Sequence, residues 1–303
     1  MSVYEFLPGY YRVAEDRRYS PEEARAYTEK IARAHYENFT VVSAFMPREL
    51  RQDMFNVYAY CRWSDDLGDE IPDPALASRA LEWWRGELEA CYADAPRHPV
   101  FVALHETIRR FDIPPEPFHH LLDAFVQDQT VKRFPTYADV EHYCARSANP
   151  VGRLVLYLFG FRDEERQRLS DATCTALQIT NFWQDVTVDW EKGRVYLPLE
   201  DLARFGVREE QIPRQEFNPA FRELMAFEVE RARGLFREGL PLLGMVPRRL
   251  RLDLELFTRG GETILDLIER QDYNVLTQRP ALSKAGKVGL IVRRLVGSLL
   301  PGK

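Results

Sequence analysis

Four polar side chains recur along one stretch of the sequence at a spacing that suits an α-helix. The segment 178–190 has no Gly or Pro and lies within an apolar-periodic run, so we predict that it is helical. Because a helix turns about 100° per residue, residues separated by three or four positions share a face. The four residues are Gln178, Asn181, Asp185 and Asp189. A narrow stripe of amides and carboxylates among apolar neighbours is costly unless positive charge lies against it.

A second acidic row ends another predicted helix, over residues 47–70. Its apolar stripe consists of Leu50, Met54, Val57 and Cys61. If this stripe is continued, the next positions on it are Asp65 and Asp69, close to the predicted C-terminus of the helix. The helix dipole disfavours negative charge at that end, and carboxylates four residues apart repel each other. A shared cation is the simplest relief for both rows.

Oxygen ligands without Cys or His favour Mg²⁺, with Mn²⁺ as the alternative, over zinc. Mg²⁺ in proteins usually binds one or two carboxylates together with substrate phosphates. We therefore expect a diphosphate held by metal ions between two helices that face each other across an apolar cavity. The alternative is that these are helix-end acids paired with surface Arg and Lys. A single acidic row would favour that alternative, whereas the presence of two rows favours the metal site. The predicted metal ligands are Asp65, Asp69, Asn181, Asp185 and Asp189.

Composition limits the class of protein. The chain has 303 residues, of which 45% are hydrophobic, so it can bury a large core. Its net charge of −6 argues against general nucleic-acid binding. Four scattered cysteines without a C-x-x-C motif indicate free thiols in a reducing cytoplasm. We find no signal-peptide pattern and no uncharged apolar run of transmembrane length.

The rest of the chain is predicted to be all-α: one domain, 1–303, of about ten helices around a central apolar cavity. Residues 1–19 form an N-terminal arm, and 273–303 form a basic C-terminal tail. Capping boxes begin at Ser20 and Thr136, and Pro150 is expected to kink a long helix. The predicted helices cover 20–39, 47–70, 75–93, 100–111, 118–130, 137–159, 171–190, 217–240 and 247–271.

The tail after Tyr273 carries six basic residues and no acid. One interpretation is a helix that lies on the inner face of the membrane, since basic amphipathic segments bind anionic lipid. The other is a terminal packing helix with a solvated basic face, which we prefer slightly.

Taken together, these motifs resemble those of the squalene and phytoene synthases, which join prenyl diphosphates head to head. Residues 58–70 are similar to the first Asp-rich motif of that family, 178–189 to the second, and 194–198 to the loop that follows it. The resemblance covers nearly the whole chain, from His35 to Lys287, and implies the isoprenoid synthase fold.

Within the family, three short segments resemble the HpnC-type hydroxysqualene synthases of bacterial hopanoid pathways: residues 35–39, 147–153 and 181–186. The branch implies conversion of presqualene diphosphate to hydroxysqualene with Mg²⁺ and without NADPH. It also implies neighbouring enzymes that make the substrate and reduce the product. Two departures agree with this branch: Arg146 replaces a tyrosine of condensing members, and Gly261 lies near another tyrosine of synthases that quench with reductant or base.

The resemblance also implies roles for individual residues. Basic groups would assist the leaving diphosphate, and aromatic groups would line a dry cavity for the carbocation. Arg146, Gln178 and Asn149 are candidates to hold the quenching water, and Arg146 is placed with the catalytic carboxylates. The expected substrate-binding residues are His35, Asn38, Phe39, Tyr58, Arg62, Gln178, Arg194, Tyr196, Arg279 and Lys287.

Three other functions are weighed against this one. The chain could be a condensing squalene or phytoene synthase that uses farnesyl diphosphate. It could be a non-catalytic assembly factor of the same fold, although the intact acidic motifs argue against that. A di-iron carboxylate bundle needs two Glu-x-x-His motifs, and the only obvious one contains Glu116 and His119.

Overall fold

The computed structural model describes residues 5–7, 9–13, 17–34 and 46–281. Over these ranges the chain is helical and contains no β-strand, which confirms the all-α prediction; Arg133 and Val195 form an isolated parallel bridge. None of the described helices is both long and apolar enough to cross a membrane. The predicted end of the first helix beyond Ala34 and the tail beyond residue 281 lie outside the described residues.

The chain divides into two compact units, and one domain over 1–303 stays a prediction. The N-terminal unit comprises Met1–Val131 and Arg146–Gln167, and the C-terminal unit comprises Lys132–Ala145 and Arg168–Lys303. The helices of the N-terminal unit are α1 (Pro21–Ala34), α3 (Arg51–Asp69), α4 (Pro74–Tyr92), α5 (Pro99–Phe111), α6 (Glu116–Thr130) and α8 (Asn149–Leu158), with 3₁₀ turns η2 (Gly9–Tyr11) and η3 (Arg48–Leu50). The C-terminal unit holds most of α7 (Tyr137–Ser147) and α9 (Glu164–Gln184), with α10 (Val186–Glu191), α11 (Leu199–Phe205), α12 (Pro219–Gly239), α13 (Arg248–Arg270), η4 (Glu209–Gln211) and η5 (Leu240–Gly244).

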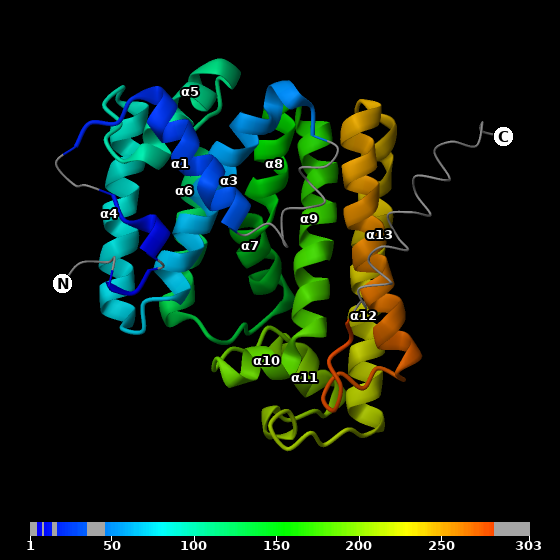
Figure 1. Cartoon of the computed structure of the whole chain (residues 1–303). Helices are drawn as coiled ribbons and strands as arrows, with labels where there is room; N and C mark the ends of the chain where they lie inside the picture. Colours follow the sequence, from blue (N-terminus) through cyan, green and yellow to red (C-terminus); the bar gives the residue numbers. More distant parts are fainter. Residues whose placement is uncertain (1–4, 8, 14–16, 35–45, 282–303) are drawn as a thin grey trace. The chain divides into compact units, whose positions relative to one another are not determined.

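Helix α3 is the centre of the N-terminal unit and packs against α1, α4, α5 and α6 (Figure 1). Its Trp63 stacks on Trp84 of α4 with ring centroids 4.9 Å apart, and both side chains are fully buried. Tyr60 lies 5.0 Å, edge to face, from the ring of Phe118 of α6. Aromatic side chains bury large areas, so this cluster holds the helix that carries the first acidic row.

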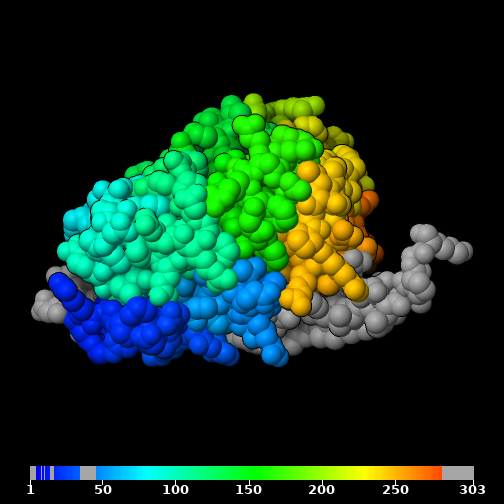
Figure 2. Space-filling view, turned by 90° about the horizontal axis from the view of Figure 1, so that it is seen from above, coloured from blue at the N-terminus to red at the C-terminus, as the bar shows by residue number. Residues whose placement is uncertain are grey.

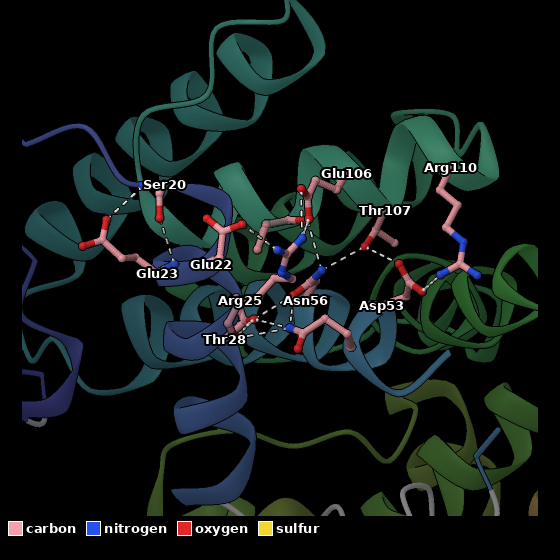
Figure 3. Close-up of polar contacts among 12 residues, drawn as sticks. Ser20, Glu22, Glu23, Arg25, Thr28, Asp53, Asn56, Glu106, Thr107 and Arg110 are labelled. Carbon is pink, nitrogen blue, oxygen red and sulfur yellow. Dashed lines mark hydrogen bonds and ion pairs between the residues drawn. The ribbon is translucent and has the colours of Figure 1, made fainter. Parts of the chain in front are cut away.

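A polar network joins α1, α3 and α5 within this unit (Figure 3). Asn56 of α3 is 1% exposed; its amide oxygen accepts from Thr28, at 2.7 Å, and its nitrogen donates to Thr107, at 3.0 Å. Nearer the surface, Arg25 pairs with Glu106 at 2.9 Å. Helices α1 (blue) and α5 (teal) lie side by side on the face seen in Figure 2. Because each buried polar atom of Asn56 is hydrogen-bonded, the network fixes the relative register of the three helices.

Glycines allow close approach of α9, α12 and α13 in the C-terminal unit. A Cβ added to Gly261 of α13 would clash with the ring of Phe236 and lie 3.0 Å from Leu177 Cδ2. A Cβ added to Gly239 would clash with Thr173 of α9. The absence of a side chain at these two positions is therefore required by the packing.

Both predicted capping boxes are present. The backbone N–H of Ser20 donates to Glu23 Oε2 at 3.0 Å, and the Glu23 N–H donates to Ser20 Oγ at 3.3 Å. Thr136 and Asp139 exchange the equivalent bonds, at 2.9 and 3.2 Å. These local signals correctly locate where α1 and α7 begin.

Several helices differ from the prediction. The expected helix 137–159 is two helices, α7 and α8, interrupted at Ala148; Pro150 lies in the first turn of α8, where a missing N–H costs nothing. The expected helix 171–190 begins earlier, at Glu164, and is interrupted at Asp185. Helix α11, over Leu199–Phe205, was not predicted, because its seven residues form only about two turns and carry little apolar periodicity.

Candidate active site

The first acidic row lies at the C-terminal end of α3. Met54 and Val57 are buried, Asp65 is partly exposed and Asp69 is exposed, so the row emerges from the core along the helix as predicted. Arg62 pairs with Asp65 at 3.1 Å and also with Asp66. The row therefore combines two accessible carboxylates, Asp65 and Asp69, with a guanidinium that contacts the first of them.

Asp66 differs from its neighbours because it is almost fully buried. Its side chain is 1% exposed and accepts hydrogen bonds from Arg62 and from Tyr11. Burial lowers the pKa of the Arg62 guanidinium, but the hydrogen bond and charge of Asp66 outweigh it, and the pKa is raised overall. Sequence reasoning missed both Asp66 and Tyr11, since nothing in the arm's composition links it to this helix.

Tyr58, expected in the diphosphate pocket, is a half-buried residue of α3. Burial raises the pKa of its phenol to about 12, so it stays protonated and can donate a hydrogen bond. The phenol interacts electrostatically with the charges of Arg62, Asp65 and Asp66.

The residues of the second acidic row keep their helical spacing although the helix is interrupted at Asp185. The N–H of Asp185 donates to the Asn181 carbonyl at 2.9 Å, and the N–H of Asp189 donates to the Asp185 carbonyl at 2.8 Å. These bonds preserve helical spacing, although Asp185 has a non-helical backbone conformation. The Asn181 side chain donates to Asp185 Oδ2 at 3.0 Å. Gln178 is half-buried one turn earlier on α9, as the stripe predicts.

Asp185 and Asp189 are too close to be independent. The pKa of Asp189 is raised to about 7, first by burial and second by the charge of Asp185, while Lys192, Arg194 and Arg279 oppose the shift. Asp189 also borders a small pocket whose other walls are Phe182, Val186, Val195, Tyr196 and Leu197. Because the two carboxylates repel each other and Asp189 is desolvated, a bound cation would stabilise their charged forms.

Arg279 is the basic residue that contacts the Asp185 carboxylate directly. Its Nη2 lies 3.0 Å from Asp185 Oδ2, and its Nε also donates to Asp185 Oδ1. Gln184 donates its side-chain N–H to the carbonyl of Pro280, which attaches the segment that carries Arg279 to the end of α9. Arg279 and Asp185, 94 residues apart in the sequence, are therefore in contact.

The loop after α10 is held by backbone bonds. The N–H of Arg194 donates to the Asp189 carbonyl at 2.8 Å, and the N–H of Val195 donates to the Lys132 carbonyl at 2.9 Å. Tyr196 is buried and stacks on Phe182 with ring centroids 3.7 Å apart and planes 3° from parallel. Phe134 and Tyr143 complete an aromatic cluster around Tyr196.

Arg146 and Asn149 belong to the N-terminal unit. Arg146 is half-buried in the last turn of α7, and Asn149 is buried at the start of α8. Burial, with the charges of Arg153 and Arg146, lowers the pKa of His120 on α6. Four expected substrate-binding residues, His35, Asn38, Phe39 and Lys287, lie outside the described residues.

The donor atoms fit the expected magnesium. Within the described ranges, no group of three or more His, Cys, Asp or Glu side chains is arranged to enclose a metal ion. The second row nevertheless offers only oxygen ligands, from Asn181, Asp185 and Asp189, and the last of these carries a pKa that a nearby cation would lower.

Comparison with known proteins supports the same interpretation of the motifs. The family model for squalene/phytoene synthase matches residues 32–286. Phytoene synthase of Thermus thermophilus is 34% identical over 274 residues, which cover 90% of this chain and 92% of that protein. Phytoene synthase of Arthrospira platensis is 30% identical over 263 residues, 82% of this chain and 85% of that protein.

Solved structures give a second comparison. The crystal structure of squalene synthase HpnC from Alicyclobacillus acidocaldarius matches with 45% identity and a TM-score of 0.81, over 84% of this chain and 96% of that one. A dehydrosqualene synthase in complex with ligand matches with 25% identity and a TM-score of 0.82, over 92% and 97%. Such enzymes process prenyl diphosphates head to head and generally use a divalent metal. The family model and the relatives together show that the chain belongs to the squalene/phytoene synthase family.

Proposed function

We propose that the protein is a hydroxysqualene synthase: it ionises presqualene diphosphate, allows the cation to rearrange, and captures water to give hydroxysqualene and diphosphate. The observation that carries this proposal is the second acidic row, in which Asp185 and Asp189 keep helical spacing and Arg279 contacts Asp185. The identity of 45% to an HpnC protein supports the branch.

The carboxylates of both rows would hold Mg²⁺ against the diphosphate. Bound Mg²⁺ would neutralise the negative charge that develops on the leaving group. Asp65 and Asp69 would serve from α3, and Asn181, Asp185 and Asp189 from α9 and α10. Arg62 and Arg279 are placed beside these carboxylates, so they can donate charge-assisted hydrogen bonds to the departing oxygens.

The carbon skeleton would then react in apolar surroundings. Breaking the C–O bond leaves a cyclopropylcarbinyl cation, which a dry aromatic wall protects while it rearranges. Tyr196 and Phe182 form such a wall beside Asp189. Water finally adds its oxygen to the cation and releases a proton, with Arg146, Gln178 and Asn149 as candidates to hold that water.

Two positions support this branch of the family. The resemblance aligns Arg146 with a tyrosine of condensing members, which argues against the first condensation, and it aligns Gly261 near a tyrosine of synthases that quench with reductant or base. Gly261 packs against Phe236 and Leu177, so no larger side chain fits there without displacement. The proposed reaction therefore needs no NADPH.

Product analysis tests the proposal. The purified protein is incubated with presqualene diphosphate and Mg²⁺, with and without NADPH, and the products are identified by mass spectrometry. We expect a C30 alcohol in both reactions and none from Asp185→Ala. Asp266→Ala, which removes a carboxylate paired with Arg233 elsewhere in the same unit, is the matched control and should retain activity.

The relatives named phytoene synthase favour one other candidate, a condensing synthase. Incubation with farnesyl diphosphate and Mg²⁺ alone distinguishes the two. Presqualene diphosphate or a longer product from farnesyl diphosphate would identify a condensing enzyme, and a hydrocarbon that requires NADPH would refute capture by water. Absence of any product, together with no Mg²⁺ binding, would indicate a non-catalytic member of the family.

A further inference from the structure

We propose that Tyr11, on the N-terminal arm, is a positioning residue for the diphosphate site. It acts through Asp66 on Arg62. The inference relies on the proposed function for what Arg62 binds, but its physical content is the chain of contacts from the arm to the first acidic row.

Tyr11 is built firmly into the N-terminal unit. Its side chain is fully buried, and its ring meets Trp63 edge to face with centroids 4.6 Å apart. Tyr27 of α1 donates its hydroxyl hydrogen to the Tyr11 carbonyl at 2.7 Å, and Trp63 Nε1 donates to the Tyr27 hydroxyl at 3.2 Å. The position of the Tyr11 hydroxyl is therefore set by α1 and α3, and not by the arm alone.

That hydroxyl completes the hydrogen bonding of a buried carboxylate. Tyr11 donates to Asp66 Oδ2, while Arg62 Nη2 donates to Asp66 Oδ1. A buried carboxylate is tolerated only when its oxygens have donors. Because the two donors grip different oxygens, they fix the rotation of the Asp66 carboxylate.

The rotation of Asp66 in turn fixes the direction of Arg62. The guanidinium bridges two acids: Nη2 contacts Asp66, and Nη1 lies 3.1 Å from Asp65 Oδ2. Asp66 thus anchors one edge of the guanidinium and turns the other edge toward the exposed acidic row. When Asp65 binds metal, that second edge is placed to donate to a diphosphate oxygen.

This arrangement separates the roles of two adjacent aspartates. Asp65 is partly exposed and can serve as a metal ligand, whereas Asp66 is 1% exposed with a donor on each oxygen. Asp66 is therefore a support for Arg62, and Tyr11 is the support for Asp66.

Removal of the Tyr11 hydroxyl would leave Asp66 Oδ2 without that donor. The carboxylate would then turn to share more of the Arg62 guanidinium, and Arg62 would be drawn away from Asp65. The aromatic packing of residue 11 would remain in Tyr11→Phe, so the loss would fall on diphosphate binding more than on folding.

The test measures binding of inorganic diphosphate to the full chain in the presence of Mg²⁺ by calorimetry, with thermal stability recorded for each variant. We expect Tyr11→Phe to weaken binding by about tenfold, the usual effect of losing a hydrogen bond to a charged group. Tyr60→Phe is the matched control: Tyr60 is a fully buried tyrosine of the same core that donates to the Phe118 carbonyl at 2.8 Å. It should lose similar stability and keep wild-type affinity.

A double-mutant cycle with Asp66→Asn gives a second measurement. Tyr11→Phe should have less than a twofold further effect when Asp66 is already replaced. Suppose that Asp65→Asn abolishes binding of diphosphate. The inference would then be overturned if Tyr11→Phe bound diphosphate with wild-type affinity, or if Tyr11→Phe and Tyr60→Phe lost the same amount of affinity. No Mg²⁺-dependent binding by the wild-type protein, or full binding by Asp65→Asn, would instead overturn the proposed function.

Discussion

Arg279 grips Asp185 with two nitrogens although the residues are 94 positions apart: Nη2 lies 3.0 Å from Oδ2, and Nε donates to Oδ1. The same carboxylate accepts from Asn181 at 3.0 Å. Arg279 thus contacts both oxygen atoms of the carboxylate that is the proposed metal ligand. Arg62 contacts Asp65 through a single pair of atoms, Nη1 and Oδ2, 3.1 Å apart. If Asp65 and Asp185 bind Mg²⁺ as proposed, we expect the arginines to move from carboxylate to diphosphate.

Arg279→Gln should therefore strengthen metal binding in the absence of diphosphate and weaken it in the presence of diphosphate. Without diphosphate, Mn²⁺ should bind about three- to tenfold more tightly, because a competing and repelling cation has been removed. With inorganic diphosphate present, binding should weaken by about tenfold, because the leaving group has lost a partner. Electron paramagnetic resonance of Mn²⁺ measures both affinities.

Arg270→Gln is the control for this experiment. It removes one positive charge at an exposed position of α13 in the same unit, without touching Asp185. A change of the same sign in both Mn²⁺ titrations of Arg279→Gln would contradict this movement of the arginine.

Gly261→Ala should destabilise the protein by about 1–3 kcal/mol, since a Cβ there clashes with Phe236 and approaches Leu177 to 3.0 Å. Gly260→Ala should stabilise it by about 0.5–1 kcal/mol, because no heavy atom lies within 4 Å of a Cβ at that position and alanine is the better helix former. Urea unfolding measures both. The pair differs by one position in one helix, so equal signs for the two variants would rule out the packing explanation.

The pH dependence of stability should contain a contribution from His98. The imidazole is enclosed by Trp63 and Trp84, its Nδ1 accepts from the Val100 N–H at 3.3 Å, and burial lowers its pKa to about 3. Because the folded pKa lies below the unfolded value of about 6.5, this contribution is complete above pH 6.5 and is lost as the pH falls.

The expected loss is about 1.4 kcal/mol per pH unit between about pH 6.5 and the folded pKa. His98→Asn keeps a residue that can cap α5 but cannot titrate, so its unfolding free energy should fall less than that of the wild type between pH 7.5 and 5.5. His142→Asn, at an exposed position of α7, is the matched control for removing a histidine. Identical slopes for the wild type and His98→Asn would show that His98 does not contribute.

Asn56→Ala should destabilise the protein by about 2–4 kcal/mol, because it removes the buried hydrogen bonds that Asn56 makes with Thr28 and Thr107 and leaves a cavity between the helices. Glu106→Gln should cost less than about 1 kcal/mol, and the cost should shrink at high salt, since its pair with Arg25 is solvent-exposed. Both changes act on the α1–α3–α5 region of Figure 3, and chemical denaturation measures both. A larger cost for Glu106→Gln than for Asn56→Ala would mean that the surface pair, and not the buried network, holds these helices.

The sequence by itself determined the helical class, both capping boxes, the two acidic rows and the family. These features are local: a capping box spans four residues, and a row of aspartates needs only helical spacing. The bond from the Asp189 N–H to the Asp185 carbonyl shows why the row was predictable even though the interruption at Asp185 was not.

Only the tertiary structure decided which charges meet. The contacts of Arg279 with Asp185 and of Tyr11 with Asp66 join residues 94 and 55 positions apart, and no periodicity specifies such distances. It also showed that adjacent aspartates differ, since Asp65 is partly exposed and Asp66 is buried with two donors. Burial and long-range partners are properties of the packed chain, and they determine whether a carboxylate can bind metal or serves to orient an arginine.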